Sequence, residues 1–306
     1  MLICEFCGLD GAADSNELQL DKNRKGFWCE SCDSYTYMDE ESTKHQFTLI
    51  LETSRKEDKV LQQDKNLKFS KQLSPFRYPG GKSKIINFLY SYLQPEKSKI
   101  LISPFAGGGS FELSMLEAGV VDKLHLNDLD FGVYAVWWVM KHMPFSLIDR
   151  LLTSKPNHSE FFIAQALIKS NFRGADKVEA AWATLLVNRL AYSGISKANP
   201  LGGKKGKKED LLSRWNPEKL IKKIERIHSM SDQIEITNEN TVSLIEEKYW
   251  LDNTTIFIDP PYFFKGKDLY QYYFTDENHL ELAYLLDNLH REFPCADILL
   301  TYDYSK

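Results

Sequence analysis

The stretch KILISPFAGGGSFELSMLEAGVVDKLHLND, residues 99–128, decides the fold of this chain. A strand-like apolar run at 99–103 leads into a glycine cluster, a helical run follows at 110–119, and residues 122–127 are again strand-like. Gly119 is expected to end the helix, because glycine readily takes the backbone conformation that closes a helical C-terminus. Strand, helix and strand in this order predict a βαβ unit with two parallel strands.

The same alternation continues on both sides of this unit. A helical run at 82–93 precedes it, and further strand-like runs follow at 233–237, 254–258 and 296–303, with a long helical run at 275–293. Alternating strands and amphipathic helices are typical of a parallel sheet covered by helices on both faces. The sequence therefore predicts an α/β fold with a Rossmann-like sheet.

Charge is unevenly distributed over the 306 residues, whose formal net charge is -5. Residues 141–230 hold 17 Lys and Arg against 8 Asp and Glu, so the rest of the chain is strongly acidic. A basic segment inside an acidic chain is a candidate footprint for a polyanion, and a solvated helical face is the alternative. We expect a zinc-ribbon module at 1–50, a polar linker at 51–73, the core at 74–140 and 231–306, and a helical insertion at 141–230.

Composition excludes several classes of protein. With 43% hydrophobic and 26% charged residues, the chain is neither disordered nor collagen-like. No apolar run approaches the roughly 20 residues that a membrane span needs, and the N-terminus lacks a signal pattern. We expect a cytoplasmic protein without a membrane partner.

Four of the five cysteines form a spaced set near the N-terminus, and Cys295 is expected to be a buried small hydrophobe. Two C-x2-C pairs separated by 21 residues have the spacing with which paired thiolates chelate one tetrahedral zinc ion. A redox-active C-x-x-C pair is the alternative. Four thiolates leave no open position for a substrate, so the zinc would be structural. The predicted ligands are Cys4, Cys7, Cys29 and Cys32.

The glycine cluster predicts a cofactor site. It follows a strand and opens a helix, where glycines let a ligand approach the backbone and the helix offers free N–H groups. The dinucleotide pattern G-x-G-x-x-G starts at Gly107 and Gly109 but meets Glu112 in place of the third glycine, which disfavours NAD. Asp128, after the next strand, is placed to accept hydrogen bonds from ribose hydroxyls. Together these residues favour an adenosine-type cofactor.

A second glycine motif, FRYPGGKSK at 76–84, fails as a phosphate loop. Phe76 occupies the position of the required first glycine, and Pro79 falls inside the loop. We expect Lys82 to pair with a carboxylate of the cofactor, with Tyr78 or Phe76 packing beside it. A helix-capping turn with a solvated lysine is the alternative.

The most specific motif is Asp259-Pro260-Pro261-Tyr262, after an apolar strand. Two prolines stiffen the bend, so that an acid, a backbone carbonyl and an aromatic ring form a pocket for a flat base with an exocyclic amine. If Asp259 and the Pro260 carbonyl accept both N–H groups, the amine lone pair is directed at an electrophilic methyl group while Tyr262 stacks on the base. An ordinary turn with an exposed tyrosine is the alternative.

In this order, the motifs resemble those of the Dam-type N6-adenine DNA methyltransferases. Residues 75–82 are similar to the first cofactor motif of that family, residues 104–110 to its glycine motif, and residues 126–130 to its ribose-binding acid. Asp259–Tyr262 match its catalytic tetrapeptide. The resemblance covers about residues 74–306.

The resemblance implies S-adenosylmethionine as methyl donor, a flipped adenine of double-stranded DNA as acceptor, and a target-recognition role for residues 141–230. The implied cofactor contacts are Tyr78, Lys82, Phe105, Gly107, Gly109, Asp128 and Asp259. The expected DNA contacts, by phosphate neutralisation or base reading near Asn188, are Arg189, Tyr192, Ser193, Lys197, Asn199, Lys204, Lys205, Lys207, Lys208 and Arg214.

Three features depart from the family pattern. Ser103 stands where an acid is common before Pro-Phe, the cysteine module is an addition, and the chain stops soon after what is expected to be the fifth strand. An open sheet edge favours pairing, and three alternatives stay open: another chain covers the edge, the fold is trimmed, or the product is incomplete. For the zinc ribbon the alternatives are docking of a protein partner and bracing of the enzyme. The alternatives left open are a catalytically silent or partner-dependent nucleic-acid-binding module, and methylation of RNA or of cytosine N4.

Overall fold

A computed structural model describes residues 67–77, 81–261, 273–292 and 295–302, together with the backbone of three short strands nearer the N-terminus. The chain divides into two compact units, Met1–Lys59 and Val60–Lys306. In the first unit, strands β1 (Leu18–Leu20), β2 (Gly26–Cys29) and β3 (Ser34–Tyr37) form an antiparallel sheet in the order β1-β2-β3. Cys29 is the last residue of β2, and Cys32 lies outside the described residues.

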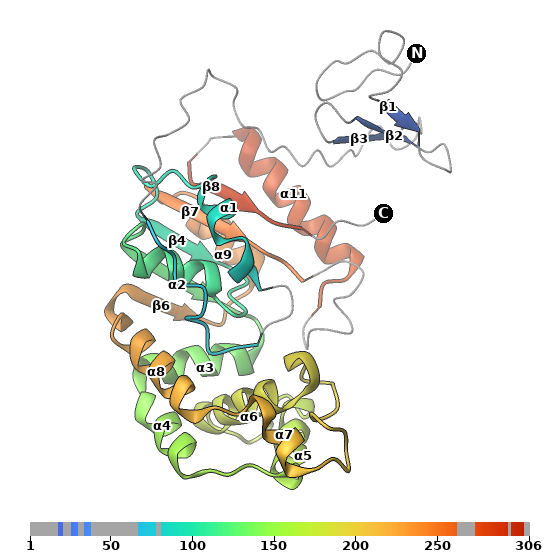
Figure 1. Ribbon diagram of the computed structural model, residues 1–306. Coiled ribbons are helices and arrows are strands. Elements are labelled where there is room, and N and C mark those ends of the chain that lie inside the picture. Colours follow the sequence, from blue (N-terminus) through green and yellow to red (C-terminus); the bar gives the residue numbers. More distant parts are fainter. Residues whose placement is uncertain are drawn as a thin grey trace. The chain divides into compact units, whose positions relative to one another are not determined.

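The second unit contains a five-stranded parallel sheet in the order β6-β5-β4-β7-β8, which confirms the predicted α/β fold (Figure 1). Its strands are β4 (Ile100–Ser103), β5 (Lys123–Asn127), β6 (Ile234–Thr237), β7 (Thr254–Ile258) and β8 (Asp297–Leu300). The chain order reverses at β4, whose two neighbours are β5 and β7. In open α/β sheets, ligands bind at such a switch point, outside the carboxyl ends of the strands.

Side-chain alternation along the strands supplies two apolar cores, one on each face of the sheet. On β7, Phe257 packs in one core while Ile256 and Ile258 pack in the other. Helices α1 (Ile86–Tyr90), α2 (Ser110–Glu117) and α3 (Phe131–His142) contribute to the first core. Helices α9 (Thr241–Lys248) and α11 (Asp276–Glu292) contribute to the second. Helices therefore cover both faces, as the sequence predicts.

A group of further helices packs against α3, most extensively with α6 (Lys177–Leu190) (Figure 1). Gly132 of α3 makes this close approach possible, because a Cβ there would lie 2.3 Å from Thr184 Oγ1 of α6 and 2.5 Å from the Phe172 ring. The group comprises α4 (Pro144–Thr153), α5 (His158–Lys169), α6 (Lys177–Leu190), α7 (Lys208–Leu211) and α8 (Pro217–His228), with 3-10 turns at Tyr192–Gly194, Leu212–Arg214 and Ser231–Gln233. The helical character expected for residues 141–230 is thus observed, and the domain boundaries stay predictions.

Two expectations on the core are wrong in detail. The helix predicted at 82–93 is a 3-10 turn at Lys82–Lys84 followed by the short α1, because Ile85 leaves helical geometry with a φ of -115°. Cys295 is exposed rather than buried, because it precedes β8 and its backbone N–H points to the Tyr249 hydroxyl. None of the helices that the structure describes is long and apolar enough to cross a bilayer.

Candidate active site

Three loops meet at the carboxyl ends of the central strands. The glycine cluster follows β4, Asp128 follows β5 and Asp259 follows β7. Because β5 and β7 flank β4, the two acids lie on either side of the glycine loop. A cavity of about 380 Å³ opens there, and its lining includes Phe105, Gly107, Gly109, Asp128, Lys82, Asp259 and Pro261. Cofactor and catalytic candidates from distant parts of the sequence thus share one cavity.

The glycine loop is held tightly against α3. Trp137 Nε1 of α3 donates a hydrogen bond to the Gly107 carbonyl at 3.1 Å. Gly109 has a φ of +58°, and a Cβ there would lie 2.8 Å from the Trp137 ring. Glycine is required at this position both by the backbone angle and by the absence of space.

Asp128 is ordered by backbone donors. Its Oδ2 accepts the Gly107 N–H at 2.8 Å, and its Oδ1 accepts the Asp130 N–H at 2.9 Å. Burial, together with the nearby Asp130 carboxyl, raises the pKa of Asp128 to about 7. Each carboxylate oxygen keeps acceptor capacity, so two hydroxyl donors side by side would be recognised. Asp130 caps α3 by accepting the Gly132 and Val133 N–H groups.

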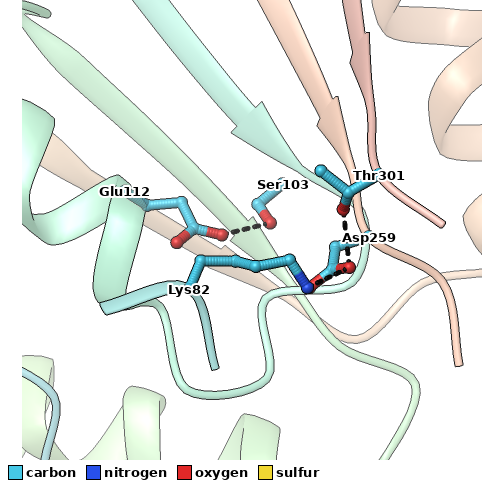
Figure 2. A network of polar contacts seen from close by, with 5 residues as sticks. All are labelled: Lys82, Ser103, Glu112, Asp259 and Thr301. Atoms are coloured by element: carbon cyan, nitrogen blue, oxygen red, sulfur yellow. Dashed lines mark hydrogen bonds and ion pairs between the residues drawn. The ribbon is translucent and has the colours of Figure 1, made fainter. Parts of the chain in front are cut away.

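Asp259 lies at the centre of a polar network at the end of β7 (Figure 2). Lys82 Nζ is 2.6 Å from both of its carboxylate oxygens, and Thr301 Oγ1 donates to Oδ1 at 2.7 Å. Burial raises the pKa of Asp259, and the Lys82 ammonium acts in the opposite direction. Lys82 thus pairs with a carboxylate of the protein itself, whereas the sequence predicts a carboxylate of the cofactor.

A second buried acid lies beside this network. Glu112, in the first turn of α2, is 3% exposed, and its Oε1 accepts the Ser103 Oγ hydrogen at 2.7 Å (Figure 2). Burial raises its pKa to about 7, to which the negative charge of Asp259 adds. Sequence reasoning treats Glu112 only as a missing glycine and does not find Thr301 at all.

Comparison with known proteins agrees with this arrangement. Residues 78–304 match the sequence model of the D12 class of N6 adenine-specific DNA methyltransferases. The chain belongs to this family. It is also similar to the Type II methyltransferase M1.LlaDCHI of Lactococcus lactis subsp. cremoris, with 26% identity over 202 residues. That alignment covers 62% of the chain and 66% of the relative, just under two thirds of the relative's length.

The site residues predicted for this D12-class chain fall into three groups. Phe105, Gly107, Gly109, Asp128, Lys82, Asp259 and Pro261 line the cavity. Pro260 is buried in the bend between Asp259 and Pro261. Tyr78 and Tyr262 lie outside the described residues, so their predicted roles stay predictions.

The DNA-binding candidates occupy two kinds of position. Most are exposed, and their contact with DNA stays a prediction: Tyr192, Ser193, Lys197, Asn199, Lys204, Lys205, Lys207, Lys208 and Arg214. Asn188 and Arg189 instead face inward from α6. Asn188 Oδ1 accepts the Arg77 N–H at 2.8 Å, and its Nδ2 donates to the Arg77 and Gly194 carbonyls.

Arg189 donates from Nη2 to the Pro75 carbonyl, and burial with Arg77 nearby lowers its pKa to about 10. In this structure Asn188 and Arg189 tie α6 to residues 75–77. The predicted contact of Arg189 with DNA stays a prediction. Residues 75–77 pack against α6, and this contact joins residues that are more than 100 positions apart in the sequence.

The predicted zinc ligands lie at the limit of the description. The backbone of Cys29 is described, but its side chain and Cys4, Cys7 and Cys32 are not. In the part of the chain whose side chains are described, no group of His, Cys, Asp and Glu could hold a metal ion. The zinc prediction is therefore not tested by the structure.

Proposed function

We propose that this chain transfers a methyl group from S-adenosylmethionine to N6 of a flipped adenine in double-stranded DNA. The observation that carries the proposal is the position of Asp259, which lies after β7 in the same cavity as the glycine loop and Asp128. Membership of the D12 class supports the reaction, and the similarity to a Type II methyltransferase supports a role in restriction-modification.

The cavity fits the proposed methyl donor. The loop at Gly107 and Gly109 presents backbone without side chains, Asp128 offers two oriented oxygens to ribose hydroxyls, and Phe105 and Val133 add apolar surface for a base. When bound, S-adenosylmethionine supplies an electrophilic methyl group on a positively charged sulfur. The chain's residues must then place a nucleophile on the far side of that methyl carbon.

Asp259 and the Pro260 carbonyl are proposed to do this by accepting the two N6 hydrogens of adenine. This arrangement directs the nitrogen lone pair at the methyl group, so that the C–N bond forms as the C–S bond breaks. The raised pKa of Asp259 suits it to receive the proton that N6 then loses. Tyr262 is proposed to stack on the flipped base.

The exposed cations of residues 197–214 are proposed to neutralise DNA phosphates. Lys204, Lys205, Lys207 and Lys208 lie between α6 and α8 with exposed side chains. Such contacts position DNA without reading its sequence.

The test is to incubate the purified protein with methyl-labelled S-adenosylmethionine and mixed-sequence double-stranded DNA, digest the DNA, and identify the labelled nucleoside by mass spectrometry. We expect N6-methyladenine. Label in N4-methylcytosine, or in RNA but not DNA, would replace the proposed substrate. Donor binding without label would favour a silent or partner-dependent module, and no donor binding would overturn the proposal.

We also propose that Cys4, Cys7, Cys29 and Cys32 hold one structural zinc ion. The spacing of the two pairs supports this. Chelation, or Cys29→Ser, is expected to release about one zinc per chain and to unfold residues 1–50 without abolishing donor binding. Unfolding of the whole chain would show that the module is integral to the core, and no bound metal would contradict the proposal.

A further inference from the structure

Glu112 is a buried carboxyl group that the proposed reaction does not use. It lies in the first turn of α2, lines the cavity, and is fixed by the Ser103 hydroxyl at 2.7 Å. Figure 2 shows one oxygen of its carboxylate turned toward the Ser103 hydroxyl. A charged group is costly to bury, so a carboxyl group at the wall of a ligand cavity needs a partner or a role.

The charges of Lys82, Asp259 and Glu112 do not sum to zero when Glu112 is ionised. The Lys82 ammonium is bound by both oxygens of Asp259 at 2.6 Å. No ion pair of Glu112 is found among the residues that the structure describes, where Ser103 is its side-chain hydrogen-bond donor. When Glu112 is ionised, Lys82, Asp259 and Glu112 together carry one net negative charge, which a cationic group of the ligand would neutralise.

The hydrogen bonds that Glu112 can still accept indicate which kind of cationic group it would bind. Ser103 occupies Oε1 and leaves the carboxylate with further acceptor positions on the cavity side. A primary ammonium has three N–H donors, whereas a sulfonium has none. The cavity therefore offers Glu112 to an ammonium group.

We propose that Glu112, held in place by Ser103, binds the α-ammonium group of the methyl donor and so selects a donor that carries an intact amino-acid end. This inference rests on the proposed function, since it names a contact of the same cofactor. Its ligand is the amino-acid end, and Asp128 on the other side of the glycine loop remains the ribose acceptor.

The proposal predicts a pH dependence of donor binding. Among the described residues, two charges shift the pKa of Glu112: Asp259, just after β7, raises it, and Lys82, from the 3-10 turn before α1, lowers it. Because the ammonium prefers the carboxylate, donor affinity should rise with pH up to about 7 and fall again at higher pH, where the α-ammonium loses its proton. Asp128 also has a pKa of about 7, so the pH profile needs a ligand that separates the two acids.

The experiment is calorimetric titration of the full chain and of Glu112→Gln with three probes. These are S-adenosylmethionine, S-adenosylhomocysteine, which keeps the ammonium, and 5′-methylthioadenosine, which keeps the ribose but lacks the amino-acid end. We expect the substitution to weaken the first two about ten- to a hundredfold, as for loss of a charged hydrogen bond, and to change the third less than about threefold.

Matched measurements separate this role from a structural one. Glu117→Gln, the same substitution in the last turn of α2 at a residue paired with Arg226, is expected to leave all three affinities within about twofold. Ser103→Ala should weaken the two amino-acid-bearing ligands by less than Glu112→Gln does. Binding of S-adenosylmethionine by wild type should release protons near pH 7, and Glu112→Gln should reduce that release to the part that Asp128 contributes.

Three results would overturn the inference. Equal weakening of all three probes would give Glu112 a merely structural role. Weakening of S-adenosylmethionine alone would assign it to the sulfonium, and unchanged affinities would remove it from donor binding. Each of these leaves donor binding by the wild-type chain intact, whereas failure of the proposed function appears as no donor binding by wild type at all.

Discussion

The carboxyl ends of the central strands and the basic segment differ in how their charged groups are held. At the carboxyl ends of the central strands, Glu112 is buried and Asp128 and Asp259 are partly buried, and all three are hydrogen-bonded and have raised pKa values. Along residues 204–208, four lysines are exposed. A buried, oriented group acts singly, because nothing nearby can replace it, whereas exposed cations act together through a field that salt screens. The difference predicts large effects of single substitutions in the first region and small, salt-dependent effects in the second.

The largest effect of a single substitution is expected for Asp259→Ala. We expect the single-turnover methylation rate to fall at least about a thousandfold, because both the hydrogen bond to N6 and the proton acceptor are lost. DNA affinity should stay within a few-fold. Asp252→Asn, an exposed residue just before β7, serves as the control and should retain activity. A large loss of DNA affinity in Asp259→Ala would make Asp259 a structural residue.

Gly109→Ala tests how rigidly the glycine loop after β4 is held. The new methyl group would meet the Trp137 ring at 2.8 Å, on a backbone with a φ of +58°. Donor affinity should fall by more than about tenfold as the loop shifts. Gly119→Ala is the matched control: its φ is +68° but no atom lies within 4 Å, so it should cost only about 1 kcal/mol of folding free energy. Equal donor affinity in the two variants would show that the loop is not sterically fixed.

Glu112→Gln should stabilise the fold in a pH-dependent manner. The pKa of Glu112 is raised from 4.5 in the unfolded chain to about 7 in the folded one, so the folded state binds the extra proton. Wild-type stability from this group is present below pH 4.5 and declines as pH rises to about 7. The variant should therefore gain up to about 3 kcal/mol over wild type at pH 8 and little at pH 4.5, measured by thermal unfolding. A gain independent of pH would contradict the burial cost assigned to this carboxyl group.

The smallest effects are expected in the basic segment. Lys204→Ala with Lys205→Ala should weaken DNA binding several-fold at low salt and reduce the slope of log affinity against log salt by up to about 1.8. The methylation rate at saturating DNA should not change. Lys99→Ala with Lys123→Ala removes two exposed lysines at the opposite end of β4 and β5 and should leave the slope unchanged. Equal slopes in both double variants would show that residues 204 and 205 do not contact phosphates.

Local patterns were sufficient to predict the sheet and the ends of its strands. Strand alternation and the glycine cluster are properties of neighbouring residues, so β4, α2, β5 and the positions of Asp128 and Asp259 followed from them. The partners of buried polar groups did not follow. Lys82 meets Asp259 across 177 residues, and Asn188 meets Arg77 across 111. Arginine and asparagine in a basic segment look like surface residues until the packing of α6 places them inside.

The network around Asp259 also has a consequence for the order in which the protein becomes functional. Lys82 precedes Asp259 by 177 residues and Thr301 follows it by 42, so three well-separated stretches of chain must meet before the acid is fully held. Contacts of such high sequence separation form late in folding, because a long loop must close before the contacts can stabilise the fold. A nascent chain that has exposed β4 to β7, but not yet residue 301, therefore carries Asp259, the proposed catalytic acid, without its complete support. On this proposal, competence for chemistry arises together with completion of the sheet, and partly synthesised chains are expected to be poor modifiers of DNA.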